Sequence, residues 1–140
     1  MSIEEYKATA DRAMQSWNAG DLEGYLQMYD PNVVLHGYQG VEPGFQNVRG
    51  FYQAFWAAFP GSQLIFEDVF GVGDEVAIRF VVRAIHAGDF QGIAATGKRV
   101  SIPGITIVRF AGGKCVERWS QADFLGLLQQ LGAIPTPGAD

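Results

Sequence analysis

Apolar side chains in the first 60 residues recur at spacings of three and four, the period of a helix that buries one face. A first helix is predicted to begin at the capping box Ser2-Ile3-Glu4-Glu5 and to stop at Gly20, a residue type that readily takes a left-handed conformation. Asp21 then caps a short second helix. A third helix carries three phenylalanines at spacings of four: Phe51, Phe55 and Phe59.

The apolar period changes to two from Gln63 onward, which is typical of strands. Gly73-Asp74 and Ala111-Gly112-Gly113 each separate two such runs, so both segments predict hairpins. Pro103-Gly104 interrupts a run and suggests a bulge or a position on a sheet edge. Because the helices come first and the strands later, the sequence predicts the α+β class, with helices covering one face of an antiparallel sheet.

Alternation along the strands singles out two titratable side chains. His86 ends an apolar row on its strand, whereas Asp123 ends a row that holds Glu117, Trp119 and Gln121. Polar groups in that number rarely line a dry core. We therefore hypothesise a concave sheet whose hollow holds both His86 and Asp123, an acid and a base in different environments.

Each candidate also has a purely structural interpretation. The segment that begins at Asp123, DFLGLLQQLG, is typical of an N-cap followed by a short amphipathic helix. A histidine at the end of an apolar strand, such as His86, is more often a hydrogen-bonded core residue than a catalyst. A histidine beside a glycine-rich loop, such as His36, is often a surface residue. Trp17 and Trp119 are most simply core residues, although a wide cavity would use them as apolar walls.

Composition and charge exclude several classes of partner and site. The 140 residues carry a net charge of −5 and their basic residues form no run, which argues against nucleic acid and anionic membranes as partners. One cysteine and two histidines fall short of a zinc-ligand pattern, so no metal site is predicted. The acidic N-terminus does not predict a secretory signal, and no apolar run is long enough to span a bilayer. We expect one soluble, cytoplasmic domain over residues 1–140.

Several short stretches stand out together. They are Phe59-Pro60 after the third helix, His86 to Gly92 followed by Thr96-Gly97-Lys98, Gly113-Lys114 with Glu117, Trp119 and Asp123, and Gln130-Leu131-Gly132. Over nearly the whole chain they resemble the SnoaL-like polyketide cyclases, or ester cyclases, of the nuclear-transport-factor-2-like superfamily. Ala95 stands where many relatives have proline, and Ala111-Gly112 replaces a more acidic turn.

The resemblance implies a cone-shaped α+β barrel, in which three N-terminal helices close a curved antiparallel sheet, and a homodimer. It also implies cofactor-independent chemistry on a small hydrophobic substrate. Asp123 then acts as general acid/base in an intramolecular aldol closure or isomerisation, and His86 assists in the same pocket. The side chains expected to bind the substrate are His36, Trp17, Trp119, Gln121, Phe51 and Phe55.

Two alternatives stay open. The same pocket suits the hydrolysis of an epoxide or a lactone, with the carboxylate activating water. The protein could instead be a non-catalytic small-molecule binder or dimerisation module, in which Asp123 only caps a helix and His86 only bonds to backbone. A structure with no cavity between these two side chains would favour the non-catalytic alternative.

Overall fold

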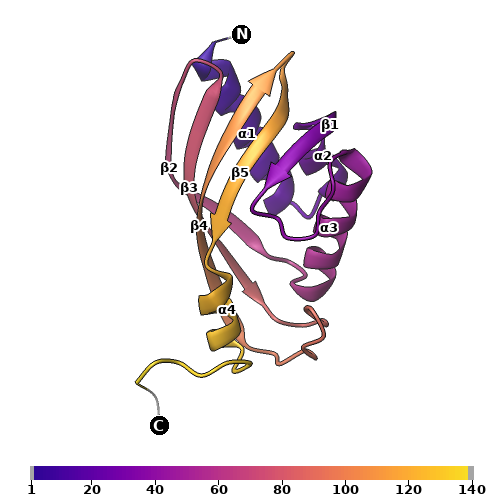
Figure 1. The fold of residues 1–140 in the computed structure, drawn as a ribbon, viewed down its shortest axis with the longest axis vertical. Coiled ribbons are helices and arrows are strands. Elements are labelled where there is room, and N and C mark those ends of the chain that lie inside the picture. Colours follow the sequence, from indigo (N-terminus) through magenta and orange to yellow (C-terminus); the bar gives the residue numbers. More distant parts are fainter. Residues whose placement is uncertain (1, 139–140) are drawn as a thin grey trace.

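The computed structural model describes residues 2–138, which form helices and strands in an α+β arrangement (Figure 1). The predicted α+β class is confirmed. In chain order the elements are α1 (Ile3–Asn18), α2 (Leu22–Leu26), β1 (Tyr29–His36), α3 (Phe45–Ala58), β2 (Gln63–Val72), β3 (Glu75–Ile85), β4 (Arg99–Ala111), β5 (Lys114–Ala122) and α4 (Phe124–Gln130).

The strands form one mixed sheet in the order β1-β5-β4-β3-β2. Strands β2 to β5 pair antiparallel with their neighbours, but β1 runs parallel to β5. The predictions of a wholly antiparallel sheet and of a closed barrel are therefore wrong, since β1 and β2 form two free edges. Alternation in a sequence indicates which face a side chain takes, but it does not indicate which strand lies alongside. The parallel partner of β1 comes from the far end of the chain.

Side-chain caps define where the first two helices begin. The Ser2 hydroxyl accepts a hydrogen bond from the Glu5 amide (3.2 Å), and the Asp21 carboxylate accepts one from the Gly24 amide (2.9 Å), so both predicted caps are confirmed. Because α1 packs against β2 and α3 against β1, the helices cover one face of the curved sheet (Figure 1). That three helices close the sheet into a cone is not confirmed. No helix within residues 2–138 is long and apolar enough to cross a membrane.

Both predicted hairpins are confirmed, one between β2 and β3 and the other between β4 and β5. The bulge or edge predicted at Pro103 and Gly104 is wrong, because β4 is a central strand and its pairing with β3 is continuous through these residues. Gly104 has a packing role instead. A Cβ atom there would lie 2.5 Å from the Phe80 ring, so the ring occupies the space that a side chain would need.

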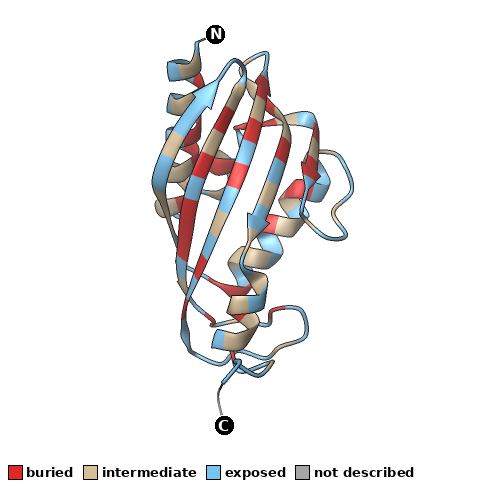
Figure 2. Cartoon of the chain, turned by 60° about the vertical axis from the view of Figure 1, so that its left-hand side comes forward, coloured by how far each residue is buried: buried red, intermediate tan, exposed pale blue. Residues whose placement is uncertain are grey.

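The sheet has a buried inner face and a partly exposed outer face, and burial alternates along its strands (Figure 2). Paired residues share a face, and Ile78, Thr106 and Ser120 mark the inner one on β3, β4 and β5. The core fills the space between this face and the helices, and Phe59 and Phe110 are among its largest fully buried side chains. Which face a functional residue takes therefore decides its surroundings.

Candidate functional site

The sheet separates the predicted site residues into two groups. One group packs in the core on the inner side, and the other lies on the outer side along β1, β5 and the start of α4. The structure thus does not bring together the side chains that the sequence assigned to one pocket. The inner group is His86, Trp17, Phe51 and Phe55, and the outer group is Asp123, Gln121, Trp119 and His36.

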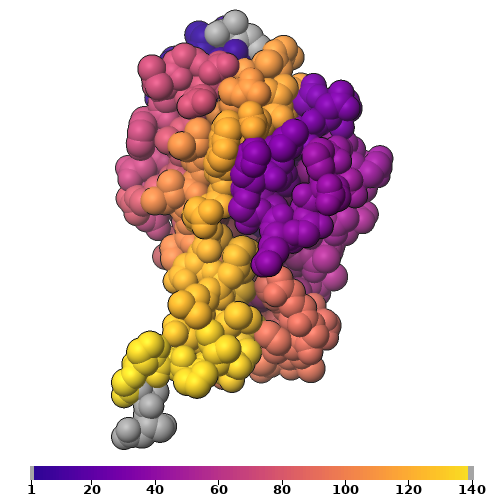
Figure 3. All heavy atoms as spheres, in the orientation of Figure 1, coloured from indigo at the N-terminus to yellow at the C-terminus, as the bar shows by residue number. Residues whose placement is uncertain are grey.

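Asp123 caps α4, which with the residues after it forms one end of the molecule (Figure 3). Its Oδ1 accepts a hydrogen bond from the Gly126 amide at 2.8 Å, and its amide donates to the Pro103 carbonyl at 2.9 Å. Asp123 is exposed, and Oδ2 has no hydrogen-bond partner among residues 2–138. The predicted cap is confirmed, and this cap orients the carboxylate while one of its oxygens stays free.

Asp123 lies at the wall of a groove of about 430 Å³ on the outer face, a volume within the range of small-molecule sites. The apolar side chains of Pro103 and Ile105 on β4 contribute to its walls. At its rim, Arg79 is held by Asp68 (2.8 Å) and by Glu67. The lining residues are Glu67, Arg79, Phe80, Pro103, Gly104, Ile105, Gln121, Ala122 and Asp123.

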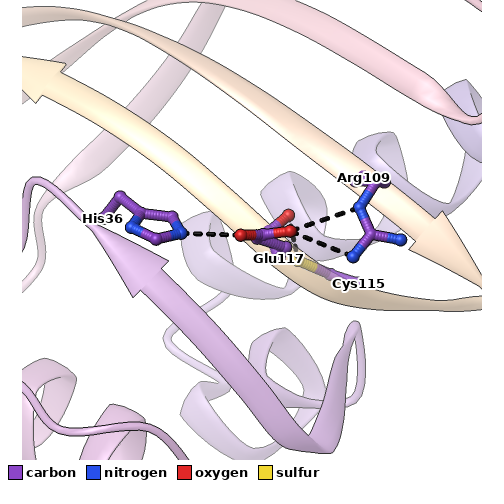
Figure 4. Close-up of polar contacts among 4 residues, drawn as sticks. All are labelled: His36, Arg109, Cys115 and Glu117. Carbon is purple, nitrogen blue, oxygen red and sulfur yellow. Dashed lines mark hydrogen bonds and ion pairs between the residues drawn. The ribbon is translucent and has the colours of Figure 1, made fainter.

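Further along the same face, Glu117 joins β1 to β4 (Figure 4). Its Oε2 lies 2.7 Å from His36 Nε2, and its Oε1 accepts a hydrogen bond from Arg109 at 3.0 Å. The hydrogen bonds from His36 and Arg109 lower the pKa of Glu117. The His36 ring also stacks on Trp119, with ring centroids 5.3 Å apart. These contacts account for His36 and Trp119 structurally, and their substrate-binding role stays a prediction.

His86 is fully buried and holds the loop between β3 and β4. Its Nδ1 accepts a hydrogen bond from the Thr96 amide at 3.1 Å, which leaves Nε2 to carry the proton of the neutral ring. Nε2 is sealed from solvent and has no partner in the described part of the chain. His86 lines no groove that contains Asp123. The hypothesised shared hollow is therefore not found, and a catalytic role for either residue stays a prediction.

The remaining inner residues belong to an aromatic cluster. Trp17 donates a hydrogen bond from Nε1 to the Ser62 hydroxyl at 3.1 Å, and its ring makes an edge contact with Tyr52. Phe51 and Phe55 are partly buried and pack against the core. Core packing accounts for Trp17 without a ligand, and the substrate contacts predicted for the three side chains stay predictions.

Arg118 is not among the predicted site residues. It is only 9% exposed, and its side chain points from β5 into the core. Its Nε donates to the Thr106 hydroxyl at 2.8 Å. Its Nη1 lies within hydrogen-bond distance of three phenol oxygens, those of Tyr29 (2.6 Å), Tyr25 (3.1 Å) and Tyr52 (3.2 Å). Alternation could have found this residue, because it is one position away from the polar outer row and so faces the core.

Burial also governs the titration of the inner side chains. It raises the pKa of Tyr25 and Tyr29, and the nearby charge of Arg118 offsets only part of that rise. Burial likewise raises the pKa of the Cys115 thiol to about 12, so this thiol stays protonated at neutral pH and is a poor nucleophile.

A second groove, of about 570 Å³, lies between the end of α2, β1 and the start of α3. Lys114 lines it and donates a hydrogen bond to the Gln27 carbonyl at 2.5 Å, so its ammonium group is already engaged. None of the predicted site residues lines this groove. Within residues 2–138 there is no cluster of three or more side chains able to hold a metal ion.

Comparison with known sequences decides the family. The sequence pattern of the SnoaL-like polyketide cyclases matches residues 7–131. The chain belongs to this family. The aklanonic acid methyl ester cyclase DnrD from Streptomyces peucetius is 26% identical over 134 residues, which cover 90% of each protein. The aklanonic acid methyl ester cyclase DauD from Streptomyces sp. strain C5 is 25% identical over 131 residues, which cover 90% of this chain and 81% of that protein.

Solved structures of relatives share the fold of this SnoaL-like chain. A proposed hydroxylase from Streptomyces galilaeus matches with a TM-score of 0.86 and 32% identity, over 96% of this chain and 85% of that chain. A proposed polyketide cyclase from Streptomyces antibioticus matches with a TM-score of 0.77 and 30% identity, over 90% of this chain and 97% of that chain. Relatives with two different proposed activities share this fold, so the reaction has to be argued from the site.

Proposed function

We propose that this SnoaL-like protein is a cofactor-independent cyclase that closes a ring within a small carbonyl compound by acid/base catalysis at Asp123. Membership of the family and its aklanonic acid methyl ester cyclase relatives support a cyclase-type role. One observation carries the choice of residue. The Gly126 amide orients the Asp123 carboxylate through Oδ1 and leaves Oδ2 without a partner among residues 2–138, and Asp123 lines a ligand-sized groove.

In the proposed reaction, Oδ2 of Asp123 removes a proton from a carbon next to a substrate carbonyl. The enolate carbon then attacks a second carbonyl carbon of the same molecule and forms the new carbon–carbon bond. The resulting alkoxide takes the proton back from the Asp123 carboxyl group. Every substrate atom is retained in the product, so the reaction consumes neither water nor a co-substrate.

The groove supplies the other parts that this reaction needs. The Gln121 side chain lines it, and its amide is a suitable hydrogen-bond donor to the enolate oxygen. Pro103 and Ile105 provide apolar walls that limit the access of water to the substrate. His86 is not at the groove, and we assign it the positioning of the Thr96 loop instead of a proton transfer.

Turnover of aklanonic acid methyl ester and of simpler polyketide esters, followed by mass spectrometry, tests the proposal. The wild type is expected to give a cyclised product of unchanged mass. Asp123→Asn is expected to lower kcat by about 10²–10⁴-fold, the usual contribution of a positioned proton transfer, with an unchanged circular dichroism spectrum. Label from heavy-oxygen water in the product would identify epoxide or lactone hydrolysis instead. Full turnover by the variant would contradict the role of Asp123.

A non-catalytic dimeric binding module is the second candidate, and two observations favour it. No described groove joins His86 to Asp123. The outer face also exposes Ile105 (59%), Ile107 (38%) and Trp119 (37%), and exposed apolar side chains on one face are typical of protein interfaces. Light scattering is expected to show a homodimer for the wild type and a monomer for Ile107→Asp. A monomeric wild type would remove this candidate interface.

A further inference from the structure

The inner cluster around Arg118 holds a buried positive charge with no carboxylate partner among residues 2–138. On the outer face, by contrast, Arg109 pairs with Glu117 at 3.0 Å. The hydrogen bonds of Arg118 run only to the Thr106 hydroxyl and to phenols. A buried charge without a counter-ion costs much free energy, so this arrangement calls for a physical reason.

The phenols cannot supply the missing negative charge. Burial raises the pKa of Tyr25, Tyr29, Tyr38 and Tyr52, so all four stay protonated at neutral pH. The Tyr38 ring faces the guanidinium, with its centroid 5.8 Å from Cζ of Arg118, and such a contact stabilises a cation without neutralising it. The cluster therefore carries a net positive charge.

One edge of the guanidinium has no hydrogen-bond partner within residues 2–138. Nε and Nη1 of Arg118 donate to hydroxyl groups, whereas Nη2 makes no hydrogen bond within residues 2–138. In that range, only Trp56 Nε1 and His86 Nε2 are polar side-chain atoms that are both sealed from solvent and without a partner. The unpartnered Nη2 is therefore not completely sealed from solvent, in keeping with the partial exposure of Arg118.

We propose that Arg118 and its four tyrosines form a binding site for an organic oxyanion, a carboxylate or an enolate, on the inner side of the sheet. The oxyanion accepts a hydrogen bond from Nη2 and compensates the buried charge, and hydrogen bonds between ionised partners are among the strongest in proteins. The hydroxyls of Thr106, Tyr25, Tyr29 and Tyr52 hold the other edge of the guanidinium, so the site is already ordered before the ligand arrives.

This site differs from the Asp123 groove in position and in charge. Arg118 points to the inner face of β5, and the groove lies on the outer face. The proposal therefore does not depend on the proposed cyclisation. Binding at Arg118 can be measured on a protein that turns over no substrate, and turnover at Asp123 can be measured without added anion.

Calorimetric titration with benzoate and with its uncharged analogue benzamide tests the site. Benzoate is expected to bind the wild type at least about tenfold more tightly than benzamide does, because only the anion carries a charge that compensates that of Arg118. Arg118→Met is expected to weaken benzoate binding by about tenfold or more. Arg109→Met makes the same type of replacement on the outer face, and it should leave the affinity for benzoate unchanged. Equal benzoate affinity in the wild type and Arg118→Met, or no benzoate binding at all, overturns the proposal.

A second ligand pair separates the two sources of the oxyanion. Dimedone is an enolate at neutral pH, and cyclohexanone is its neutral counterpart. Binding of dimedone that depends on Arg118 supports the enolate form of the proposal, and binding of benzoate alone supports the carboxylate form. If neither anion depends on Arg118, the cluster only ties the sheet to the helices and the proposal is wrong.

Nuclear magnetic resonance of the wild type covers the case in which Arg118→Met does not fold. The Nε–H resonance of Arg118 is assigned through its contacts with the tyrosine rings. It is expected to shift on addition of benzoate and to stay in place on addition of benzamide. An Arg118 resonance that does not respond to benzoate overturns the proposal without any variant.

Discussion

Glu117 and Arg118 are neighbours on β5, yet the two faces of the strand give them opposite surroundings. Glu117 lies on the outer face, where His36 and Arg109 bind its carboxylate within reach of solvent. Arg118 lies on the inner face, where it meets only hydroxyls and aromatic rings. The outer charges are paired and screened by water, whereas the inner charge is held rigidly and is largely shielded from water.

Because of this difference, we expect the inner face to contribute most to stability and the outer face to carry the proposed proton transfer. Removing an inner contact leaves buried polar groups without partners, which costs much more than loss of a surface ion pair. Proton transfer needs a group that can meet the substrate, and Asp123 satisfies that condition on the outer side. We therefore expect inner substitutions to change stability most and outer substitutions to change activity or pH response.

Arginine replacements on the two faces should give the largest difference in stability. Arg118→Met is expected to lower the free energy of unfolding by about 2–3 kcal/mol, because the phenols and the Thr106 hydroxyl lose a charged donor, although removal of a buried charge offsets part of the loss. Arg109→Met should cost about 0–1 kcal/mol, the usual value for an exposed pair. Urea unfolding at neutral pH measures both values, and equal losses would contradict the distinction between the faces.

Two helix caps with the same local geometry provide a smaller and more specific test. A Cβ atom on Gly126 would lie 2.3 Å from Oδ2 of Asp123, and one on Gly24 would lie 2.3 Å from Oδ2 of Asp21. Gly126→Ala and Gly24→Ala should each displace a capping carboxylate, which lowers stability. The higher helix propensity of alanine offsets part of this loss, so the net change in the free energy of unfolding should be about 1 kcal/mol or less in both variants.

Activity should distinguish the two caps. Gly126→Ala is expected to lower kcat by about tenfold or more, because a catalytic group moved by a fraction of an ångström works poorly. Asp21 lines neither of the two grooves described, so the Gly24→Ala variant should convert substrate at the rate of the wild type. A matched loss of activity in both variants would indicate a general effect on the fold, and it would remove the special role of Asp123.

The pH dependence of stability should show the smallest effect. The pKa of Glu117 is lowered in the folded state, so its contribution is present above the unfolded value of about 4.3 and is lost as the pH falls through the folded value. Glu117→Gln should remove this part of the acid sensitivity. The pKa values of the inner tyrosines are raised in the folded state, so their effect appears at alkaline pH, where stability is lost only above the unfolded value of about 10. Unfolding midpoints from pH 3 upward that run parallel in both proteins would contradict the assignment to Glu117.

Local signals in the sequence were sufficient for most elements of the fold. The caps at Ser2, Asp21 and Asp123 and both glycine-containing hairpins follow from residues only a few positions apart. The parallel pairing of β1 with β5 was not predictable in this way, because it depends on contacts between residues more than 80 positions apart, as in His36 and Trp119.

The site was predicted less well, for a related reason. Alternation placed His86 and Asp123 on their strands, but the pairing of β3, β4 and β5 shows that these rows face opposite sides of the sheet. The same alternation places Arg118 on the inner face, where four tyrosines from other elements surround its charge. Those tyrosines come from α2, β1, α3 and the loop after β1, and no local pattern groups them.

Deuterium exchange tests the central claim most directly, which is that Asp123 moves a proton at carbon. The ligand is a polyketide ester analogue without the second carbonyl group, so that it forms the enolate but cannot cyclise. In heavy water, the wild type is predicted to exchange the proton next to the remaining carbonyl, and Asp123→Asn to exchange it about 10²–10⁴-fold more slowly. Asp21→Asn, which neutralises the equivalent capping carboxylate of α2, is predicted to exchange it at the wild-type rate. Equal exchange by the wild type and Asp123→Asn would contradict the proposed mechanism.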